Sequence, residues 1–309
     1  MENILHKTRI AFFGTKGWFF TNKYLEKFIS SGANIVVFVQ DTTGSFKSTL
    51  QDEGSGEIIE QAAKRLNVPV LTPEDIKDKK FQKQFTLYKP DVIVVCGYQY
   101  YIPKEVINAV PIGIINFHSS LLPRHCGMHP GFWTIWYGDR TSGMTVHFMD
   151  DGIDTGDIIY FSKVPVKTGD TIETLYERIW NSGMTLADKL LDDLDKGSLL
   201  RKKQDYSKYT YNYDICERDF ELDFRQPAEI LKRRIMMLPG KFYFNLGCIK
   251  FYVYDCDVLN KPLKTRKFKI NIPYLINEQI IFVTPRQFLA IKKVKKDRMD
   301  FNPLDLLKI

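Results

Sequence analysis

Short apolar runs that lack polar alternation, separated by segments of helical periodicity, constrain the fold of this chain most strongly. Four such runs, rich in Val, Ile and Phe, cover residues 9–13, 35–39, 91–96 and 112–117. Between the first two runs, apolar residues recur at helical spacing, namely at Phe20, Tyr24, Phe28 and Ile29. Strands that are apolar on both faces and alternate with helices are typical of a parallel sheet covered on each side. The sequence therefore predicts an α/β fold with a largely parallel sheet.

A second, smaller domain is predicted after a polar segment. Residues 170–173 have the pattern of a capping box at the start of a helix, and Gly197 is a plausible end of that helix. Residues 199–213 are polar and are interpreted as a linker. Beyond them, one helix is predicted over residues 228–237, and strands over 242–245, 249–254, 280–284 and 288–291. We expect one large domain over residues 1–203 and a β-rich, barrel-like domain over residues 204–309.

Composition indicates a globular chain with an anionic partner. The 309 residues are 44% hydrophobic and carry a net charge of +7, which favours a phosphorylated molecule or nucleic acid as partner. No apolar run approaches the ~20 residues that span a bilayer, and residues 1–9 lack a signal-peptide pattern, so a cytoplasmic location without membrane contact is predicted. The five cysteines are odd in number and show no C-x-x-C spacing, so neither a disulfide framework nor a metal site is predicted.

Four of the five histidines fall within residues 116–157, at the end of an apolar strand. Asn116 and His118 are two residues apart there, so their side chains point to the same side of the sheet. An amide donor beside an imidazole suits acyl transfer, in which a developing oxyanion needs hydrogen bonds and a proton moves near neutral pH. A lone Asn-x-His pattern fits a capped strand end equally well.

Asp154 lies between two apolar runs, residues 144–149 and 157–160, and is flanked by Gly152 and Gly156. Glycines at such positions let the backbone turn sharply and approach a ligand. A carboxylate near His118 would orient the imidazole and stabilise its charged form. Taken alone, Asp154 fits a structural turn as well.

The segment from residue 116 to residue 159 resembles the signature of the folate-dependent formyltransferases. The matching elements are N-x-H-x-S-L-L-P from Asn116, a glycine at Gly127, Gly143-x-Thr145 and Asp154-x-Gly156. The resemblance implies a Rossmann-like catalytic domain and 10-formyltetrahydrofolate as formyl donor. It also implies that Asn116, His118 and Asp154 match the catalytic asparagine, histidine and aspartate of that family.

The same resemblance implies contacts with the cofactor, whose anionic folate tail also suits the net positive charge. The pterin would lie against backbone of the segment after the third apolar run and of the loop that precedes Asp154, with one leucine near the ring. The residues concerned are Tyr98, Gln99, Tyr100, Ile102, Leu121, Asp151 and Gly152.

The acceptor of the formyl group is predicted from two departures from the methionyl-tRNA formyltransferase pattern. Residues 124–133 lack its R-G-A-A-P-I motif and are more similar to sugar N-formyltransferases. Residues 41–54 contain a single lysine, Lys47, where the tRNA enzymes carry a strongly basic loop, and a loop poor in cations binds RNA weakly. We expect a nucleotide-linked amino sugar, such as a dTDP-4-amino-4,6-dideoxy sugar, as substrate.

Four residues are predicted to contact that substrate: Lys16, Trp18, His129 and Trp133. A homodimer is a further expectation. Two alternatives stay open at this point, a methionyl-tRNA formyltransferase with tRNA as partner and a non-catalytic folate- or RNA-binding module.

Overall fold

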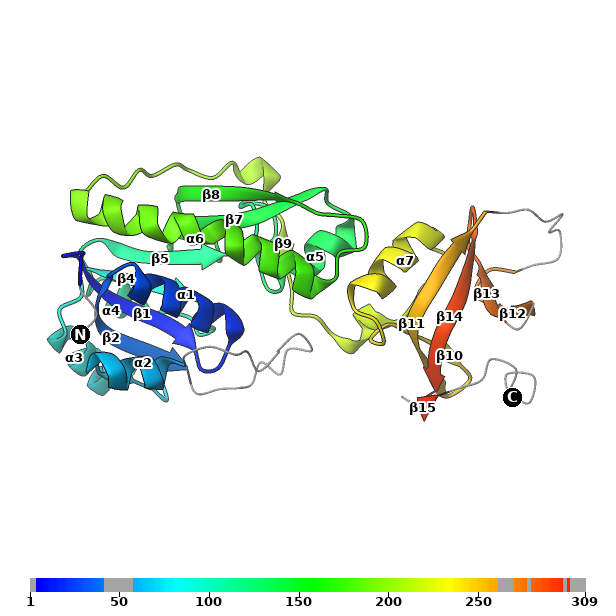
Figure 1. Ribbon diagram of the computed structural model, residues 1–309, viewed down its shortest axis with the longest axis horizontal. Helices are drawn as coiled ribbons and strands as arrows, with labels where there is room; N and C mark the ends of the chain where they lie inside the picture. Colours follow the sequence, from blue (N-terminus) through cyan, green and yellow to red (C-terminus); the bar gives the residue numbers. More distant parts are fainter. Residues whose placement is uncertain (1–3, 42–57, 261–268, 277–278, 297–298, 301–309) are drawn as a thin grey trace. The chain divides into compact units, whose positions relative to one another are not determined.

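The computed structural model describes residues 4–41, 58–260, 269–276, 279–296 and 299–300 (Figure 1). The chain packs into two compact units that are discontinuous in sequence. The first comprises residues 1–127, 142–164 and 176–212, and the second comprises residues 128–141, 165–175 and 213–309. The predicted domain boundary between residues 203 and 204 concerns which segments fold independently, and it stays a prediction.

The first unit is built on a mostly parallel sheet, which confirms the predicted α/β class. Its strands are β1 (Arg9–Thr15), β2 (Asn34–Asp41), β3 (Val70–Leu71), β4 (Val92–Cys96), β5 (Gly113–His118), β7 (Thr141–Phe148) and β8 (Ile158–Pro165). Their order is β3-β2-β1-β4-β5-β7-β8, with β7 antiparallel to β5. The direction of strand order reverses between β1 and β4, and ligands of Rossmann-like sheets bind beyond the carboxyl ends of strands at such a point.

Helices cover both faces of this sheet. They are α1 (Phe19–Ser30), α2 (Ile59–Leu66), α3 (Lys79–Leu87), α4 (Lys104–Ile107) and α6 (Ile172–Lys196). Neighbouring residues of a strand point to opposite faces, so Phe12 packs against Phe28 of α1, whereas Phe13 packs against Phe85 of α3. This double burial explains why the strands are apolar along their whole length. Figure 1 shows α1 and α6 lying close together, and Tyr24 donates a hydrogen bond to the Trp180 carbonyl between them.

Two local predictions need correction. The capping box of α6 is formed by Thr171 and Thr174: the Thr171 N–H donates to the Thr174 hydroxyl at 3.0 Å, and the Thr174 N–H donates to the Thr171 hydroxyl at 3.3 Å. Asp170 accepts from the Lys167 N–H at 2.6 Å and from the Thr174 hydroxyl at 3.1 Å. The linker interpretation of residues 199–213 is also wrong, because β9 (Tyr211–Asn212) pairs with β6 (Cys126–Gly127) and Lys202 bridges to Ile158. Backbone pairing of a polar segment leaves no hydrophobic pattern from which it could be predicted.

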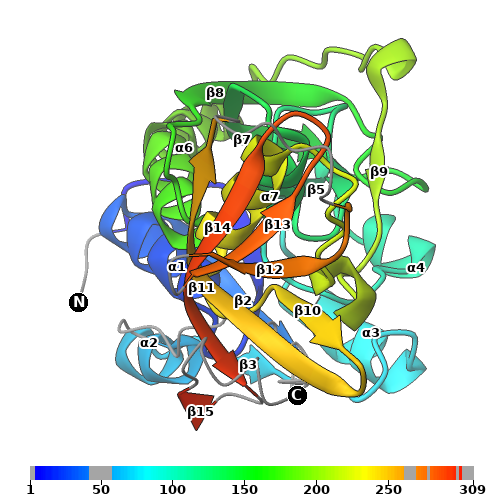
Figure 2. The same cartoon turned by 90° about the vertical axis from the view of Figure 1, so that its right-hand side faces the viewer.

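The second unit contains an antiparallel sheet that curls as a half-barrel (Figure 2), as predicted. Its strands are β10 (Tyr243–Leu246), β11 (Ile249–Leu259), β12 (Pro273–Ile276), β13 (Gln279–Val283), β14 (Phe288–Lys296) and β15 (Met299–Asp300). This unit also contains two helices, α5 (Pro130–Tyr137) and α7 (Ala228–Met237), and a 3-10 turn at Glu217–Phe220, whereas the 3-10 turn at Tyr206–Lys208 belongs to the first unit. Phe224 stacks on Phe282 in its core. None of the described helices is both long and apolar enough to cross a bilayer.

Candidate active site

The neighbouring strands β5 and β7 place the polar side chains of Asn116 and His147 side by side. The antiparallel register sets Asn116 opposite His147, and Asn116 Nδ2 lies 3.1 Å from His147 Nε2. The other ring nitrogen of His147, Nδ1, lies 2.8 Å from the Phe148 carbonyl oxygen. Because a carbonyl only accepts, Nδ1 carries the proton and Nε2 accepts from the Asn116 amide. His147 thereby orients the side chain of Asn116.

The turn between β7 and β8 presents Asp154 to the same place. Its Oδ2 accepts a hydrogen bond from the Gly127 N–H at 2.8 Å and lies 3.4 Å from His118 Nδ1. Its Oδ1 lies 3.5 Å from both His147 Nε2 and Asn116 Nδ2. The structure therefore brings together the three predicted catalytic residues, Asn116, His118 and Asp154, and adds His147 to them.

The His118 ring lies between two oxygen acceptors. Its Nε2 is 2.8 Å from the His125 carbonyl oxygen and must donate to it, whereas Nδ1 faces the Asp154 carboxylate. In the neutral ring this leaves a lone pair on Nδ1 facing a carboxylate, and gain of a proton there would create a hydrogen bond. The ring is thus oriented to take up a proton at Nδ1.

Burial sets the resting charges of this pair. Burial lowers the pKa of His118 and outweighs the opposing attraction of Asp154, so His118 is neutral at rest. Burial alone would raise the pKa of Asp154, but the attraction of a protonated His118 and the hydrogen bond from the Gly127 N–H hold it well below its ordinary value. The site therefore pairs a permanent carboxylate with an imidazole that is free to accept a proton.

The predicted cofactor segment follows β4 at the carboxyl edge of the sheet. Tyr98 packs its ring against Phe13, and within the described residues its buried hydroxyl has no hydrogen-bond partner. The backbone N–H of Gln99 donates to Asp41 at 3.2 Å, Tyr100 is exposed and Ile102 is buried. A buried hydroxyl without a partner in the described part of the chain is a polar group that could hydrogen-bond with a ligand.

The other predicted cofactor residues lie on two loops of the first unit. Leu121 is half-buried and packs beside Gly143, where a Cβ would lie 2.8 Å from its Cδ2; glycine is needed there because the same Cβ would lie 1.9 Å from the Ser162 carbonyl oxygen. Asp151 forms an exposed ion pair with Lys104 at 2.8 Å, which links the turn before Asp154 to the segment after β4. The Gly152 N–H donates to Asp150 at 3.1 Å.

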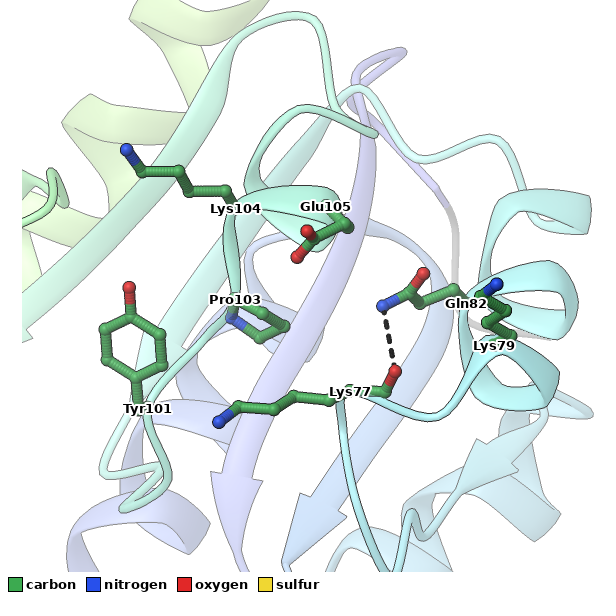
Figure 3. A pocket seen from close by; sticks show the side chains of 7 residues that line it. All are labelled: Lys77, Lys79, Gln82, Tyr101, Pro103, Lys104 and Glu105. Atoms are coloured by element: carbon green, nitrogen blue, oxygen red, sulfur yellow. Dashed lines mark hydrogen bonds between the residues drawn. The ribbon is translucent and has the colours of Figure 1, made fainter.

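A pocket of about 420 Å³ opens beside the segment after β4 (Figure 3). It is lined by Lys77, Lys79, Gln82, Tyr101, Pro103, Lys104 and Glu105. Figure 3 shows Lys77 extending toward Tyr101 while Gln82 donates to the Lys77 carbonyl. Lys104 is paired with Asp151, and the other two lysines against Glu105 leave the lining positive, which suits an anionic group. Sequence reasoning missed Lys77 and Lys79, because they belong to a polar stretch without any motif.

The predicted substrate residues divide between the two units. Lys16 forms an ion pair with Glu60 at 2.5 Å, and Trp18 lies so close to Gly97 that a Cβ there would approach the indole to 2.3 Å. His129 and Trp133 lie in the second unit, where His129 pairs with Asp214 at 2.9 Å and the Trp133 indole donates to the Tyr213 carbonyl. Of the loop at residues 41–54, Lys47 and its neighbours from residue 42 onward lie outside the described residues.

Comparison with known proteins defines the family. Residues 8–191 match the formyl transferase family model. A methionyl-tRNA formyltransferase of Lachnospira eligens is 30% identical over 304 residues, which are 94% of each chain, and one of Koribacter versatilis is 36% identical over 216 residues, 69% of each chain. The chain therefore belongs to the formyltransferase family, as its sequence predicts.

Solved structures share the fold. WlaRD, a sugar 3N-formyl transferase solved with dTDP and 5-N-formyl-THF, has a TM-score of 0.64 at 18% identity, covering 93% of this chain and 98% of its own. An N-formyltransferase of Helicobacter canadensis, in complex with folinic acid and dTDP-3-aminofucose, has a TM-score of 0.63 at 16% identity, covering 92% and 99%. At this level of identity the likeness establishes the fold alone.

Proposed function

We propose that this protein transfers a formyl group from 10-formyltetrahydrofolate to the primary amine of a nucleotide-linked amino sugar in the cytoplasm. The observation that carries the chemistry is the contact set around Asp154, whose carboxylate lies against His118, His147 and Gly127 at the carboxyl edge of the sheet. The donor supplies the formyl carbon, and the residues of this chain bind, orient and move protons.

His118 and Asp154 divide the proton transfer between them. The amine must lose a proton while its nitrogen bonds to the formyl carbon, and a neutral His118 beside an ionised Asp154 can accept it at Nδ1. The resulting imidazolium would be bonded at both nitrogens, to the carboxylate and to the His125 carbonyl. The imidazolium can then return this proton to N10 of the donor as the bond between N10 and the formyl carbon breaks, so that tetrahydrofolate leaves and His118 is neutral again. Asn116 donates an amide N–H to the developing oxyanion, with His147 fixing its orientation.

The donor fits the residues beyond β4. The buried Tyr98 hydroxyl, which has no hydrogen-bond partner among the described residues, offers a hydrogen bond to a ligand that reaches it, and half-buried Leu121 offers an apolar contact for the pterin ring. The glutamate tail of the cofactor carries carboxylates, and the lysine-lined pocket beside Tyr101 offers Lys77 and Lys79 to them.

The sugar acceptor is favoured by residues 124–133, which contain His129 and Trp133 in place of the motif typical of tRNA enzymes. Lys16, at the carboxyl end of β1, is half-exposed and could exchange Glu60 for a pyrophosphate. A nucleotide sugar has the anionic charge that the net positive chain favours.

Methionyl-tRNA is the second candidate acceptor, because relatives 30% and 36% identical to this chain carry that name. A non-catalytic binding module is less consistent with a neutral imidazole held against an ionised carboxylate. A homodimer stays an expectation.

An assay that compares the candidate acceptors separates these functions. Purified protein is supplied with 10-formyltetrahydrofolate and either a panel of dTDP- and UDP-linked amino sugars or methionyl-tRNA, and formyl incorporation is measured by mass spectrometry. We expect turnover with one amino sugar at a kcat/KM at least about 100-fold above that of any competing acceptor, a difference of about 2.7 kcal/mol. Formylation of methionyl-tRNA alone would overturn the sugar assignment, and no turnover with any amine would overturn the enzymatic one.

A further inference from the structure

Residues 202–212 pack along the candidate active site and contact both groups that surround His118. We call these residues the bracing segment. They belong to the first unit, together with Asp154, His118 and His125. The segment is attached to the sheet through Lys202, which exchanges two backbone hydrogen bonds with Ile158 at 2.8 and 2.9 Å, and through β9.

Side chains of the bracing segment hold three consecutive carbonyls of the Asp154 turn. Gln204 Nε2 donates to the Asp154 carbonyl at 2.7 Å and to the Gly156 carbonyl at 2.8 Å. The Tyr206 hydroxyl donates to the carbonyl between them, that of Thr155, at 2.8 Å. The acceptors of this turn are therefore satisfied from one neighbouring segment.

The turn needs such support because of its backbone conformation. Asp154 has φ 55°, in the left-handed region, which costs a non-glycine residue on the order of 1 kcal/mol. Carbonyls in a tight turn lack the regular partners of a strand and must find others. Without the Gln204 amide the turn would relax, and the Asp154 carboxylate would leave its position 3.4 Å from His118 Nδ1.

A glutamine at position 204 is less stabilising than an apolar residue would be if the side chain only filled space. Its side chain is 6% exposed, and its Oε1 is buried without a hydrogen-bond partner among the described residues. A buried unsatisfied oxygen costs about 1–3 kcal/mol, which an apolar side chain of the same length would avoid. Only a donor, however, can bind two carbonyls at once.

The same segment fixes the other partner of His118. Thr210 accepts from the His125 N–H at 2.8 Å, and Asn212 Nδ2 lies 3.1 Å from His125 Nδ1. The His125 carbonyl in turn accepts from His118 Nε2. Both acceptors of the His118 ring are therefore held by the bracing segment.

From these contacts we infer that Gln204 is a positioning residue, which sets the distance between the Asp154 carboxylate and His118 by holding the turn that carries Asp154. The inference rests on the roles proposed above for Asp154 and His118. It concerns orientation, and Gln204 itself contacts neither reactant in this assignment.

The first test replaces Gln204 by methionine, which keeps the length of the side chain and removes both donors. We expect kcat to fall about 10- to 100-fold, the loss associated with a small misplacement of a reacting group, while KM for both substrates stays within about two-fold. Gln84→Met is the matched control, since Gln84 is exposed on α3 in the same unit. A higher KM for either substrate with an unchanged kcat would overturn the inference.

A double-mutant cycle separates positioning from general damage to the fold. In the Asp154→Asn background, Gln204→Met should change kcat by less than about two-fold, because the group that it positions is already disabled. If the double variant instead loses kcat by the product of the two single-variant factors, Gln204 acts independently of Asp154 and the inference is overturned. If Gln204→Met does not fold, Gln204→Asn, which keeps the amide but shortens its reach, takes its place in the cycle.

A readout that needs no turnover distinguishes failure of this inference from failure of the proposed function. Asp154 raises the pKa of His118, whereas burial and the neighbouring His147 and His125 lower it. Moving the carboxylate away should shift the titration of the His118 ring to lower pH, as followed by imidazole ¹⁵N NMR in the Gln204 variant. An unchanged midpoint would overturn the inference even if the enzyme formylates an amino sugar, and a lowered midpoint would support it even if no acceptor is formylated.

Discussion

Asp154 Oδ2 lies 3.4 Å from His118 Nδ1, although the two residues belong to different elements of the fold. His118 is fixed by the register of β5, and Asp154 by a left-handed turn between β7 and β8. The pair is almost entirely buried, with side chains 8% and 13% exposed. Charge interactions at this distance are therefore poorly screened by water, and small changes in geometry have large effects on proton transfer.

Replacement of His118 by alanine should abolish transfer without abolishing binding. The imidazole is the group oriented to accept the amine proton, and loss of a general base typically costs about 10²- to 10⁴-fold in kcat. Binding of a folate analogue, measured by calorimetry, should stay within about three-fold, because the predicted folate contacts are made by other residues. His6→Ala, before β1 and paired with Asp195, is the control. Equal loss of binding and transfer would contradict the assignment.

Replacement of Asp154 by asparagine should change how stability depends on pH. The pKa of Asp154 in the folded protein lies below its unfolded value of about 3.9, so its ionised form stabilises the fold above that pH, and the contribution is lost as pH falls toward the folded pKa. The free energy of unfolding of the original protein should therefore drop more steeply below about pH 4 than that of the variant.

Denaturant unfolding at pH 7, 5, 4 and 3 measures this difference. Asp192→Asn, at an exposed position of α6, should leave the pH profile as it is. Parallel profiles for the original protein and Asp154→Asn would mean that the carboxylate makes no net favourable contact in the fold.

The parallel sheet and the three central site residues could be predicted from the sequence, because burial on both faces and a dense motif leave local patterns. His147 could not, since its contact with Asn116 depends on β7 lying antiparallel beside β5, and apolar runs do not specify strand order. The contacts of Gln204 could not be predicted from the sequence for a related reason. A polar segment that binds through side-chain amides has the same composition as a linker.

Gly127→Ala should disturb the fold and the site together. Gly127 has φ 88°, and a Cβ there would lie 2.5 Å from the Asn212 carbonyl oxygen, so alanine adds a steric clash to the backbone strain. Its N–H also donates to Asp154. Gly169→Ala is a matched control, because Gly169 has φ 84° with nothing within 4 Å of the added Cβ.

We expect Gly169→Ala to lose about 1–2 kcal/mol of stability from strain alone. Gly127→Ala should lose more and should also lower kcat. Thermal unfolding and formyl transfer, measured on both variants, give the comparison. Equal stability losses, with full activity in both, would show that the turn at Gly127 yields to the added methyl group.

The lysine-lined pocket predicts how the enzyme responds to the length of the folate tail. Lys77→Glu and Lys79→Glu reverse the charge at the pocket wall, so each should raise KM for a polyglutamylated donor about two- to five-fold, the range expected of solvated ion pairs. KM for the monoglutamate donor should change less, because fewer carboxylates reach the lysines, and kcat should stay constant since the reacting atoms are untouched. Lys64→Glu, on the exposed face of α2, controls for net charge. The tail assignment fails if both donors respond equally to Lys77→Glu and Lys79→Glu, or if Lys64→Glu has the same effect as they do, because a general electrostatic field would then account for the change.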